Sequence, residues 1–291
     1  MITLNDKEDS VSSLQNKIDF AVVLRVKHAN PNGDPLNGNR PRTDYNGNGE
    51  ISDVFLKRKL RDRLMEAGQK IFVQSDDRKN DDAKSLRDRA EKALGGKFGS
   101  ADTARLANET WFDVRAFGQL FALPKKSKSK GAEEEGDTGI SIPIRGPVTV
   151  QSAFSLKPVD VTSTQITKSV SGEGDGTKRG SDTMGMKHRV DDAVYVFYGS
   201  MNPQLAVRTG FSDEDAEAIK AVLPKLFEND ASSARPEGSM EVLKVLWWKQ
   251  PKPGKYSSAK VHASLHMNED GSGSYTLGAL DGLTPEEIPG F

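Results

Sequence analysis

The chain has 291 residues, of which 35% are hydrophobic and 29% are charged, and its formal net charge is −1. This length favours about two domains, or one domain with large insertions. The absence of cysteine excludes disulfides and thiolate metal sites and fits a reducing compartment. No segment approaches the ~18 apolar residues of a membrane span, and the first residues lack the apolar run of a signal peptide. We therefore expect a soluble, cytoplasmic protein without membrane contact.

The first predicted element is a strand over residues 18–28. Apolar residues alternate there with a second set that turns basic toward its end, at Arg25 and Lys27. Residues 29–50 are rich in Gly, Asn and Pro and are predicted to be a loop. Ser52 is a plausible N-cap, so a helix is expected over 53–67, ending at Gly68.

A charged and mostly helical region follows, at residues 69–142. Helices are expected within it at 81–94, 101–112 and 113–121. The tract 125–139 is too polar to pack, so it is expected to be disordered or ordered only by a partner.

The second half of the chain supplies the other strands. They are expected at 142–156, 191–201 and 240–249, and Ser212 with Asp215 resembles a capping box that opens a helix. The order is therefore strand, helix, strand, strand, helix, strand. This order predicts an α+β, ferredoxin-like fold, which RNA-recognition modules also use.

Two segments resemble metal sites, and neither pattern is complete. Asp44, Asn46, Asn48, Gly49 and Ser52 fall where a calcium-binding EF-hand loop places its ligands, but the twelfth position, which needs a bidentate acid, is Phe55. An Asx-rich turn is the better interpretation.

His262 and His266 are four residues apart, like two zinc ligands on a helix. The residues between them lack the glutamate of a zinc protease, and the segment could equally be a strand. Trp247 and Trp248 lie on one predicted strand and must face opposite ways, so we expect one in the core and one at an interface.

Charge is segregated along the chain. The predicted helix carries a run of cations against one acid, Asp62; these are Lys57, Arg58, Lys59, Arg61 and Arg63. Helical spacing puts Leu56, Leu60 and Leu64 in one narrow apolar stripe, with Lys57 and Arg61 in a row beside it. Replacing those two cations is therefore expected to spare the fold.

The basic helix has two interpretations. It could be a solvated face, or it could bind a nucleic-acid backbone, because cations four residues apart are about 6 Å from each other. Arg25 and Lys27 on the strand, with Arg40 and Arg42 in the loop, favour a groove of cations that follows phosphates without reading bases. The near-zero net charge does not exclude this function, because acids and bases occupy different segments.

A series of motifs carries a family resemblance. "DFAVVLRVKHANPNGDPLNGNRPRTD" is followed in order by "SDVFLKRKLR", "DVRAFGQLF", "IRGPVTVQSAFS" and "DDAVYVFYGSMNP". Together these segments resemble the backbone subunit of type I CRISPR surveillance complexes (Cascade). The resemblance is to the Cas-seven type of RAMP protein, in the form found in subtype I-C, and it spans residues 18 to 250.

The resemblance implies a ferredoxin-like (RRM-like) palm with a helical fingers insertion and a thumb β-hairpin. Its expected segments are palm at 18–68, 143–156 and 188–250, fingers at 69–142, thumb at 157–187 and a C-terminal extension at 251–291. It also implies a non-catalytic subunit, without metal or cofactor, that polymerises along the CRISPR RNA. The implied partners are that RNA, target DNA paired through the guide, further copies of the chain and the other Cascade subunits.

The resemblance also implies which residues contact RNA. The expected contacts are Arg25, Lys27, Asn32, Arg40, Arg42, Lys57, Arg58, Arg61, Lys178, Arg179, Met184 and Met186. Methionine suits a wedge beneath a displaced base, because it is apolar and adaptable.

Two other functions stay open. One is a type III-like backbone subunit that cleaves target RNA with a loop aspartate, Asp34 or Asp44. The other is a metalloenzyme built on His262 and His266.

Overall fold

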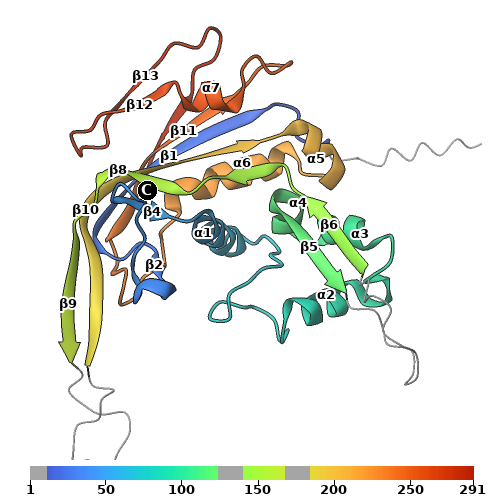
Figure 1. Ribbon diagram of the computed structural model, residues 1–291. Coiled ribbons are helices and arrows are strands. Elements are labelled where there is room, and N and C mark those ends of the chain that lie inside the picture. The colour runs from blue at the N-terminus through green and yellow to red at the C-terminus, as the bar shows by residue number, and fades with distance from the viewer. Residues whose placement is uncertain (1–11, 124–139, 168–183) are drawn as a thin grey trace, which may run out of the picture.

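The computed structural model describes residues 12–123, 140–167 and 184–291 (Figure 1). The tract 125–139 and the predicted RNA contacts Lys178 and Arg179 lie outside these ranges. Within them the chain is a mixed α+β protein built on an antiparallel sheet. No helix of the described residues is both long enough and apolar enough to cross a membrane.

The main sheet has eight strands. Its pairing order is β14-β11-β1-β10-β8-β4, and β7 and β9 also pair with β10. The strands are β1 (Ile18–Ala29), β4 (Asn48–Ile51), β7 (Val148–Val150), β8 (Ala153–Pro158), β9 (Val161–Thr167), β10 (Met184–Met201), β11 (Met240–Lys249) and β14 (Glu286–Pro289). The central strand β1 is antiparallel to both of its neighbours, β10 and β11.

Helices and small sheets surround the main sheet. The helices are α1 (Asp53–Glu66), α2 (Leu86–Leu94), α3 (Thr103–Thr110), α4 (Phe112–Phe117), α5 (Pro203–Thr209), α6 (Asp213–Val222) and α7 (Ser258–His262). The short 3-10 turns are η1 (Pro35–Asn37), η2 (Gly95–Lys97) and η4 (Leu223–Lys225). Three two-stranded sheets join β2 (Gly33–Asp34) to β3 (Arg40–Pro41), β5 (Gly118–Leu123) to β6 (Ile140–Arg145), and β12 (Leu265–Met267) to β13 (Tyr275–Leu277).

The main sheet is covered on both faces. On the helix side, Phe20, Val22 and Leu24 of β1 pack in one core with the leucine stripe of α1 and with residues of α6. On the C-terminal side, Ala21 and Val23 pack with residues of α7 and β12. Figure 1 shows α1 and α6 on one side of the sheet and α7, β12 and β13 on the other. Burial on both faces explains why nearly the whole first half of β1 is apolar.

Several local predictions are confirmed. The strand predicted at 18–28 is β1, and the strand predicted at 240–249 is β11. The helix predicted at 53–67 is α1, whose N-cap Ser52 accepts a hydrogen bond from the Phe55 amide. The predicted capping box of Ser212 and Asp215 opens α6.

Some local predictions need correction. The segment 29–50, predicted to be a loop, contains β2, β3 and most of β4. The segment 113–121 is helical as far as Phe117 and then continues as strand β5. Gly118 makes this possible, because its φ is 84° and a Cβ there would lie 2.3 Å from the carbonyl oxygen of Ile144. Both Trp247 and Trp248 are buried, in the two opposite cores, so the alternation was right but neither tryptophan is at the surface.

The region between α1 and β7 has a core of its own. Phe72, Leu94, Trp111 and Phe121, from the segment after α1 and from α2, α3–α4 and β5, pack together in a third cluster. Figure 1 shows these elements beside the main sheet, at the opposite end from β9.

At the other end of the sheet, β10 continues beyond its partners. Residues 184–190 of β10 pair with β9, whereas residues 190–201 pair with β1. The β9–β10 pair therefore leaves the sheet at Val190 and forms an arm that projects from the body (Figure 1). Most side chains of this arm are exposed, so it buries little apolar surface of its own.

Candidate nucleic-acid interface

The loop 29–50, called the Asn/Gly loop below, is held against the start of α1 by one side chain. Oδ1 of Asn32 accepts hydrogen bonds from the amide and from Oγ of Ser52, both at 2.9 Å. Since Ser52 is also the N-cap of α1, Asn32 fixes the direction in which the loop enters the helix. The structure thus gives Asn32 a positioning role within the predicted interface.

The EF-hand-like segment is an Asx turn, as predicted. Oδ1 of Asp44 accepts hydrogen bonds from the amides of Asn46 (2.9 Å) and Asn48 (2.8 Å). Asp34, the other candidate aspartate for catalysis, accepts from the Leu36 amide and lies 3.5 Å from Arg42. Both carboxylates therefore have partners within the loop.

The base of the arm brings together residues far apart in the sequence. Arg40 of β3 donates from Nη1 to Oγ of Ser163 in β9, at 3.0 Å, and the same Oγ lies 2.8 Å from Nδ1 of His188 in β10. Ser163 and His188 are directly opposite each other in the β9–β10 register, so they share one face of the arm. The Asn/Gly loop and the arm thus meet at a group of three polar side chains.

The two methionines lie on this same face. Residues two apart on a strand point the same way, so Met184, Met186 and His188 face one direction and Lys187 faces the other. The side chains of Met184 and Met186 are 65% and 56% exposed. Of the predicted RNA contacts, Arg40, Met184 and Met186 are therefore on one surface, and this juxtaposition is the clearest feature of the candidate interface.

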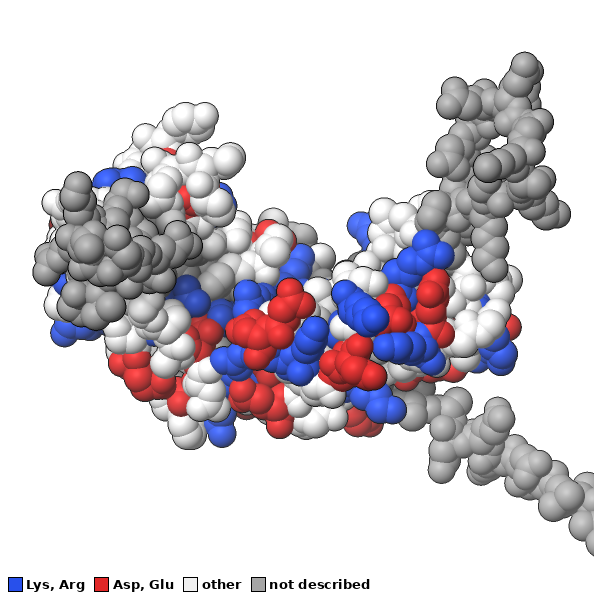
Figure 2. Space-filling model, turned by 90° about the horizontal axis from the view of Figure 1, so that it is seen from below, with Lys and Arg blue, Asp and Glu red and all other residues white. Residues whose placement is uncertain are grey.

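The cations of α1 are not free. Lys57 lies 3.0 Å from Asp53, and Arg58 lies 3.0 Å from Asp77 and 3.9 Å from Asp62. The side chains of Lys57 and Arg58 are 26% and 48% exposed. In the space-filling view from below, acidic and basic side chains stand next to each other instead of forming one basic stripe (Figure 2). The sequence favoured a groove of cations that follows phosphates, and in the structure Lys57 and Arg58 of this set each have an acidic partner.

Two further cations of α1 pair with acids from other segments. Lys59 pairs with Asp230, and burial lowers the pKa of Lys59 although Asp230 opposes this effect. Arg61 donates from Nε to Oδ2 of Asp113 at 2.8 Å, and its guanidinium lies over the Phe117 ring. Since Asp113 is 1% exposed, removing Arg61 would leave a buried carboxylate without its cation. This pair argues against the expectation that replacing Arg61 spares the fold.

Arg25 lies on the other face of the sheet from α1. It is opposite Val194 in the register, and Val194 and its neighbour Val23 belong to the C-terminal-side core. Arg25 also forms a two-point ion pair with Asp192, at 2.8 and 2.5 Å, which raises its pKa. Lys27, two residues further along β1, is exposed and has no ion pair within the described ranges. Strand alternation thus separates Arg25 from the helix cations that the sequence had grouped with it.

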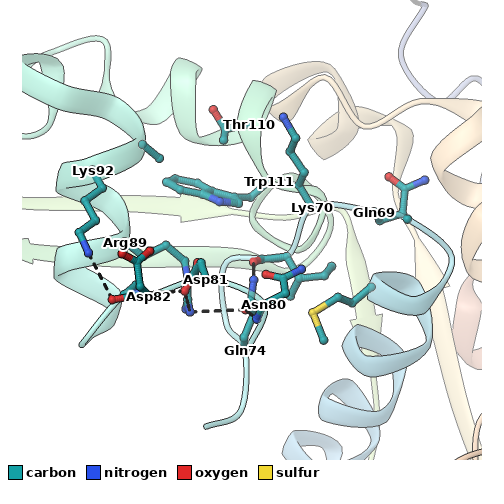
Figure 3. A pocket seen from close by; sticks show the side chains of 15 residues that line it. Gln69, Lys70, Gln74, Asn80, Asp81, Asp82, Arg89, Lys92, Thr110 and Trp111 are labelled. Atoms are coloured by element: carbon teal, nitrogen blue, oxygen red, sulfur yellow. Dashed lines mark hydrogen bonds and ion pairs between the residues drawn. The ribbon is translucent and has the colours of Figure 1, made fainter. Parts of the chain in front are cut away.

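A pocket among the described residues lies elsewhere. It has a volume of about 490 Å³ and lies between the end of α1, the segment 69–83 and the ends of α2 and α3 (Figure 3). Its lining includes Met65, Lys70, Arg89 and Trp111, but none of the predicted RNA contacts.

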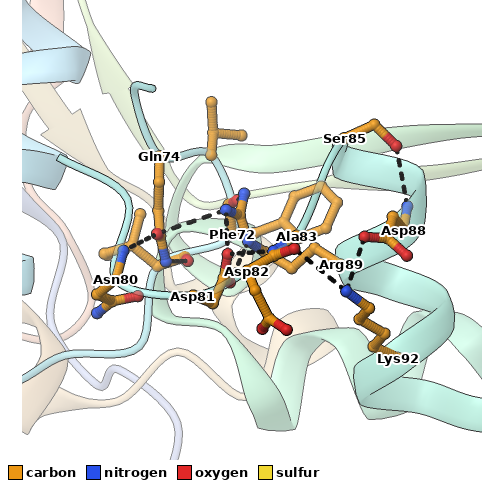
Figure 4. Close-up of polar contacts among 12 residues, drawn as sticks. Phe72, Gln74, Asn80, Asp81, Asp82, Ala83, Ser85, Asp88, Arg89 and Lys92 are labelled. Atoms are coloured by element: carbon orange, nitrogen blue, oxygen red, sulfur yellow. Dashed lines mark hydrogen bonds and ion pairs between the residues drawn. The ribbon is translucent and has the colours of Figure 1, made fainter. Parts of the chain in front are cut away.

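Arg89 of this pocket is held mainly by contacts within the protein. It donates to both carboxylate oxygens of Asp81, at 2.6 and 2.8 Å, and to the Phe72 carbonyl at 2.7 Å. A longer contact of 3.5 Å reaches Gln74 (Figure 4). These four bonds use four of the five guanidinium donors and fix the segment after α1 onto α2.

The two histidines predicted as candidate zinc ligands do not form a site. Nε2 of His262 lies 3.2 Å from the Gly199 carbonyl and 3.7 Å from Oδ1 of the buried Asp19, and its ring stacks on Tyr198. His266 is exposed on β12. In the part of the chain that the structure describes, no group of three or more His, Cys, Asp or Glu residues could hold a metal.

Sequence reasoning missed two residues of the arm base, Ser163 and His188. Their segment is polar and glycine-rich, a composition that by itself indicates a loop. The alternation of Met184, Met186 and His188 was a usable signal, because it places one imidazole and two thioethers on one strand face.

A family model and a curated relative that match this chain carry the same description. The family model described as CRISPR-associated protein Cas7 matches residues 16–278. A curated relative from Haloferax volcanii, "CRISPR-associated protein Cas7", is 27% identical over 270 residues, which covers 89% of this chain and 77% of the relative.

Solved structures give weaker similarity. One chain of a "CRISPR RNA-guided surveillance complex, pre-nicking" aligns with a TM-score of 0.48 and 15% identity, covering 88% of this chain and 82% of that chain. A chain of a "CRISPR RNA-guided surveillance complex" aligns with a TM-score of 0.43 and 17% identity, covering 88% of this chain and 77% of that chain.

Proposed function

Because the chain belongs to the family described as CRISPR-associated protein Cas7, we propose that it is the RNA-binding backbone subunit of a CRISPR surveillance complex. It binds the CRISPR RNA along its length, stacks on further copies of itself and contacts the other Cascade subunits. The guide then pairs with target DNA in segments. The subtype that its motifs resemble is I-C.

The observation that carries this proposal is the arm base. Arg40, Ser163 and His188 offer hydrogen-bonding groups to a phosphate, and exposed Met184 and Met186 lie beside them on the same face. A backbone-binding protein needs polar and cationic groups for phosphates and apolar surface for bases, with no sequence readout. This surface supplies both.

The proposed subdivision follows the strand order. The strands β11, β1, β10 and β8, with α1 and α6, form the ferredoxin-like palm, and their pairing order supports this assignment. Residues 69–142 are the fingers, which have a separate core. Residues 157–187 are the thumb, of which the β9–β10 arm is the described part. Residues 251–291 are a C-terminal extension that covers the second face of the sheet.

The subunit is proposed to act by binding and not by catalysis. Asp34 and Asp44, the candidate aspartates for RNA cleavage, accept hydrogen bonds from loop amides. The test is to incubate the assembled complex with complementary RNA and Mg²⁺. We expect intact RNA, whereas cuts at regular intervals would support the cleaving alternative.

The main test uses the chain expressed with its partner subunits. We expect a purified complex that contains a CRISPR RNA of uniform length, because a closed filament protects the strand it coats. A well-assembled complex with heterogeneous RNA, or with none, would contradict the proposed function.

A further inference from the structure

The cations of α1 form ion pairs of two kinds. Arg61–Asp113 and Lys59–Asp230 are inaccessible, because their side chains are almost entirely buried. In contrast, Arg58 and Asp77 are 48% and 67% exposed, so solvent and ligands can reach both partners. A ligand cannot reach the buried pairs without disturbing the fold, whereas it can separate the exposed pair.

A second accessible pair lies in the Asn/Gly loop. Arg42 approaches Asp34 at 3.5 Å, and both side chains are about one third exposed. Asp34 belongs to β2, which pairs with β3, and Arg40 of β3 contacts the arm base. The Asp34–Arg42 pair is therefore next to the surface on which Met184 and Met186 lie.

Accessible ion pairs contribute little to stability, because two exposed charges are already well solvated. A phosphate can therefore replace the carboxylate beside an arginine at small cost. Each such contact nevertheless gains less than a contact to an unpaired arginine, since an existing interaction must be given up. A strand that touches one such arginine gains almost nothing, whereas one that engages many in an ordered array accumulates affinity.

We propose that Asp34 and Asp77 are specificity-determining residues, which occupy Arg42 and Arg58 in the free chain and yield them to the phosphates of the guide. This inference rests on the proposed function. The two carboxylates weaken the binding of stray single-stranded RNA by a lone subunit. Assembly on a guide overcomes them, because many phosphates are then engaged at once.

The remaining contacts of the two arginines fit this role. After Asp77 is displaced, Arg58 keeps a distant carboxylate, Asp62, at 3.9 Å. The Asp62 side chain is only 5% exposed, so it cannot follow an arginine that turns toward solvent. Asp34 also accepts from the Leu36 amide, so displacing Arg42 leaves that carboxylate partly satisfied.

The test measures binding of an unrelated single-stranded RNA to the full-length chain, before assembly, over a range of salt concentrations. The variants are Asp77→Asn and Asp34→Asn. Asparagine keeps the acceptor that caps the turn at Leu36, so the Asp34 change removes the charge and little else. The control is Glu91→Gln, which frees Arg87 from an equally exposed pair (50% and 49%) on α2 and changes the net charge by the same amount.

Each aspartate variant is expected to bind about two- to fivefold tighter than wild type, which corresponds to removing one exposed ion pair. Its salt slope should be steeper by about one, because one further phosphate contact forms. Glu91→Gln should change neither quantity measurably. Effects equal to those of Glu91→Gln, or weaker binding in both aspartate variants, would overturn the inference alone. Absence of RNA binding in wild type, variants and the assembled complex would overturn the proposed function as well.

Discussion

Arg61 of α1 and Asp113 of α4 form an ion pair between residues 52 positions apart, with 2.8 Å between Nε and Oδ2. Asp113 also accepts from the amides of Phe72 and Val73, at 2.6 and 3.0 Å. One buried carboxylate thus ties the basic helix to the start of the region with its own core.

This geometry predicts that Arg61→Ala destabilises the protein by about 3 kcal/mol, because it leaves a buried carboxylate without its cation. Lys57→Ala, on the same helix face, should cost less than about 0.5 kcal/mol, because its partner Asp53 is exposed. Urea unfolding of the two variants measures the difference. Equal destabilisation by both would mean that the Asp113 pair does not hold the two regions together.

RNA binding by the free chain should depend on Lys27 and Arg40, which have no acidic partner within the described residues. Lys27→Gln combined with Arg40→Gln should weaken RNA binding and lower the salt slope by roughly two, because each substitution removes one phosphate-binding cation. The control replaces two exposed lysines of the segment after α1, Lys79 and Lys84, with glutamine. A matching decrease of the slope in the control would show that net charge, and not position, governs binding.

The exposed methionines of the arm give a prediction that separates folding from function. Met184→Ser with Met186→Ser should change the free energy of unfolding by less than about 0.5 kcal/mol, because neither side chain is in the core. The variant should still lose nuclease protection of the guide in the assembled complex.

Ile166→Ser is the matched control for the methionines. Ile166 is 49% exposed, but it is opposite Gly185 in the register and so lies on the other face of the arm. We expect this variant to protect the guide as wild type does. Equal loss of protection in both variants would argue against a role specific to the methionine face.

His262 predicts a pH dependence of stability. Burial lowers its pKa from the ordinary 6.5, although the nearby Asp19 carboxylate opposes the effect. As the pH falls below about 6.5, the unfolded chain takes up the proton before the native state does, so the free energy of unfolding decreases. His262→Asn should lose less stability than wild type between about pH 7.5 and 5.5, measured by urea unfolding. A steeper decrease in the variant would mean that the protonated imidazole pairs favourably with Asp19.

Elements that depend on local chemistry were predictable from the sequence. The alternation around Phe20 predicted β1, and Ser52 and Gly68 indicated the ends of α1, because strand faces and helix caps depend on residues only a few positions apart. The Asx turn at Asp44 was predictable for the same reason. The motif series also indicated the family that the comparison with the family model establishes.

The roles of the charged residues became visible only in the folded chain. Helical spacing put Lys57, Arg58 and Arg61 together, but Asp77 and Asp113, which pair with the two arginines, come from other segments, and no local pattern indicates which acid will pair with which base. The arm base is equally non-local, since Arg40 and Ser163 are 123 positions apart. Charge attraction acts through space, whereas sequence patterns report neighbours along the chain. The sequence could therefore locate the cations, and only the fold could show which of them are already paired.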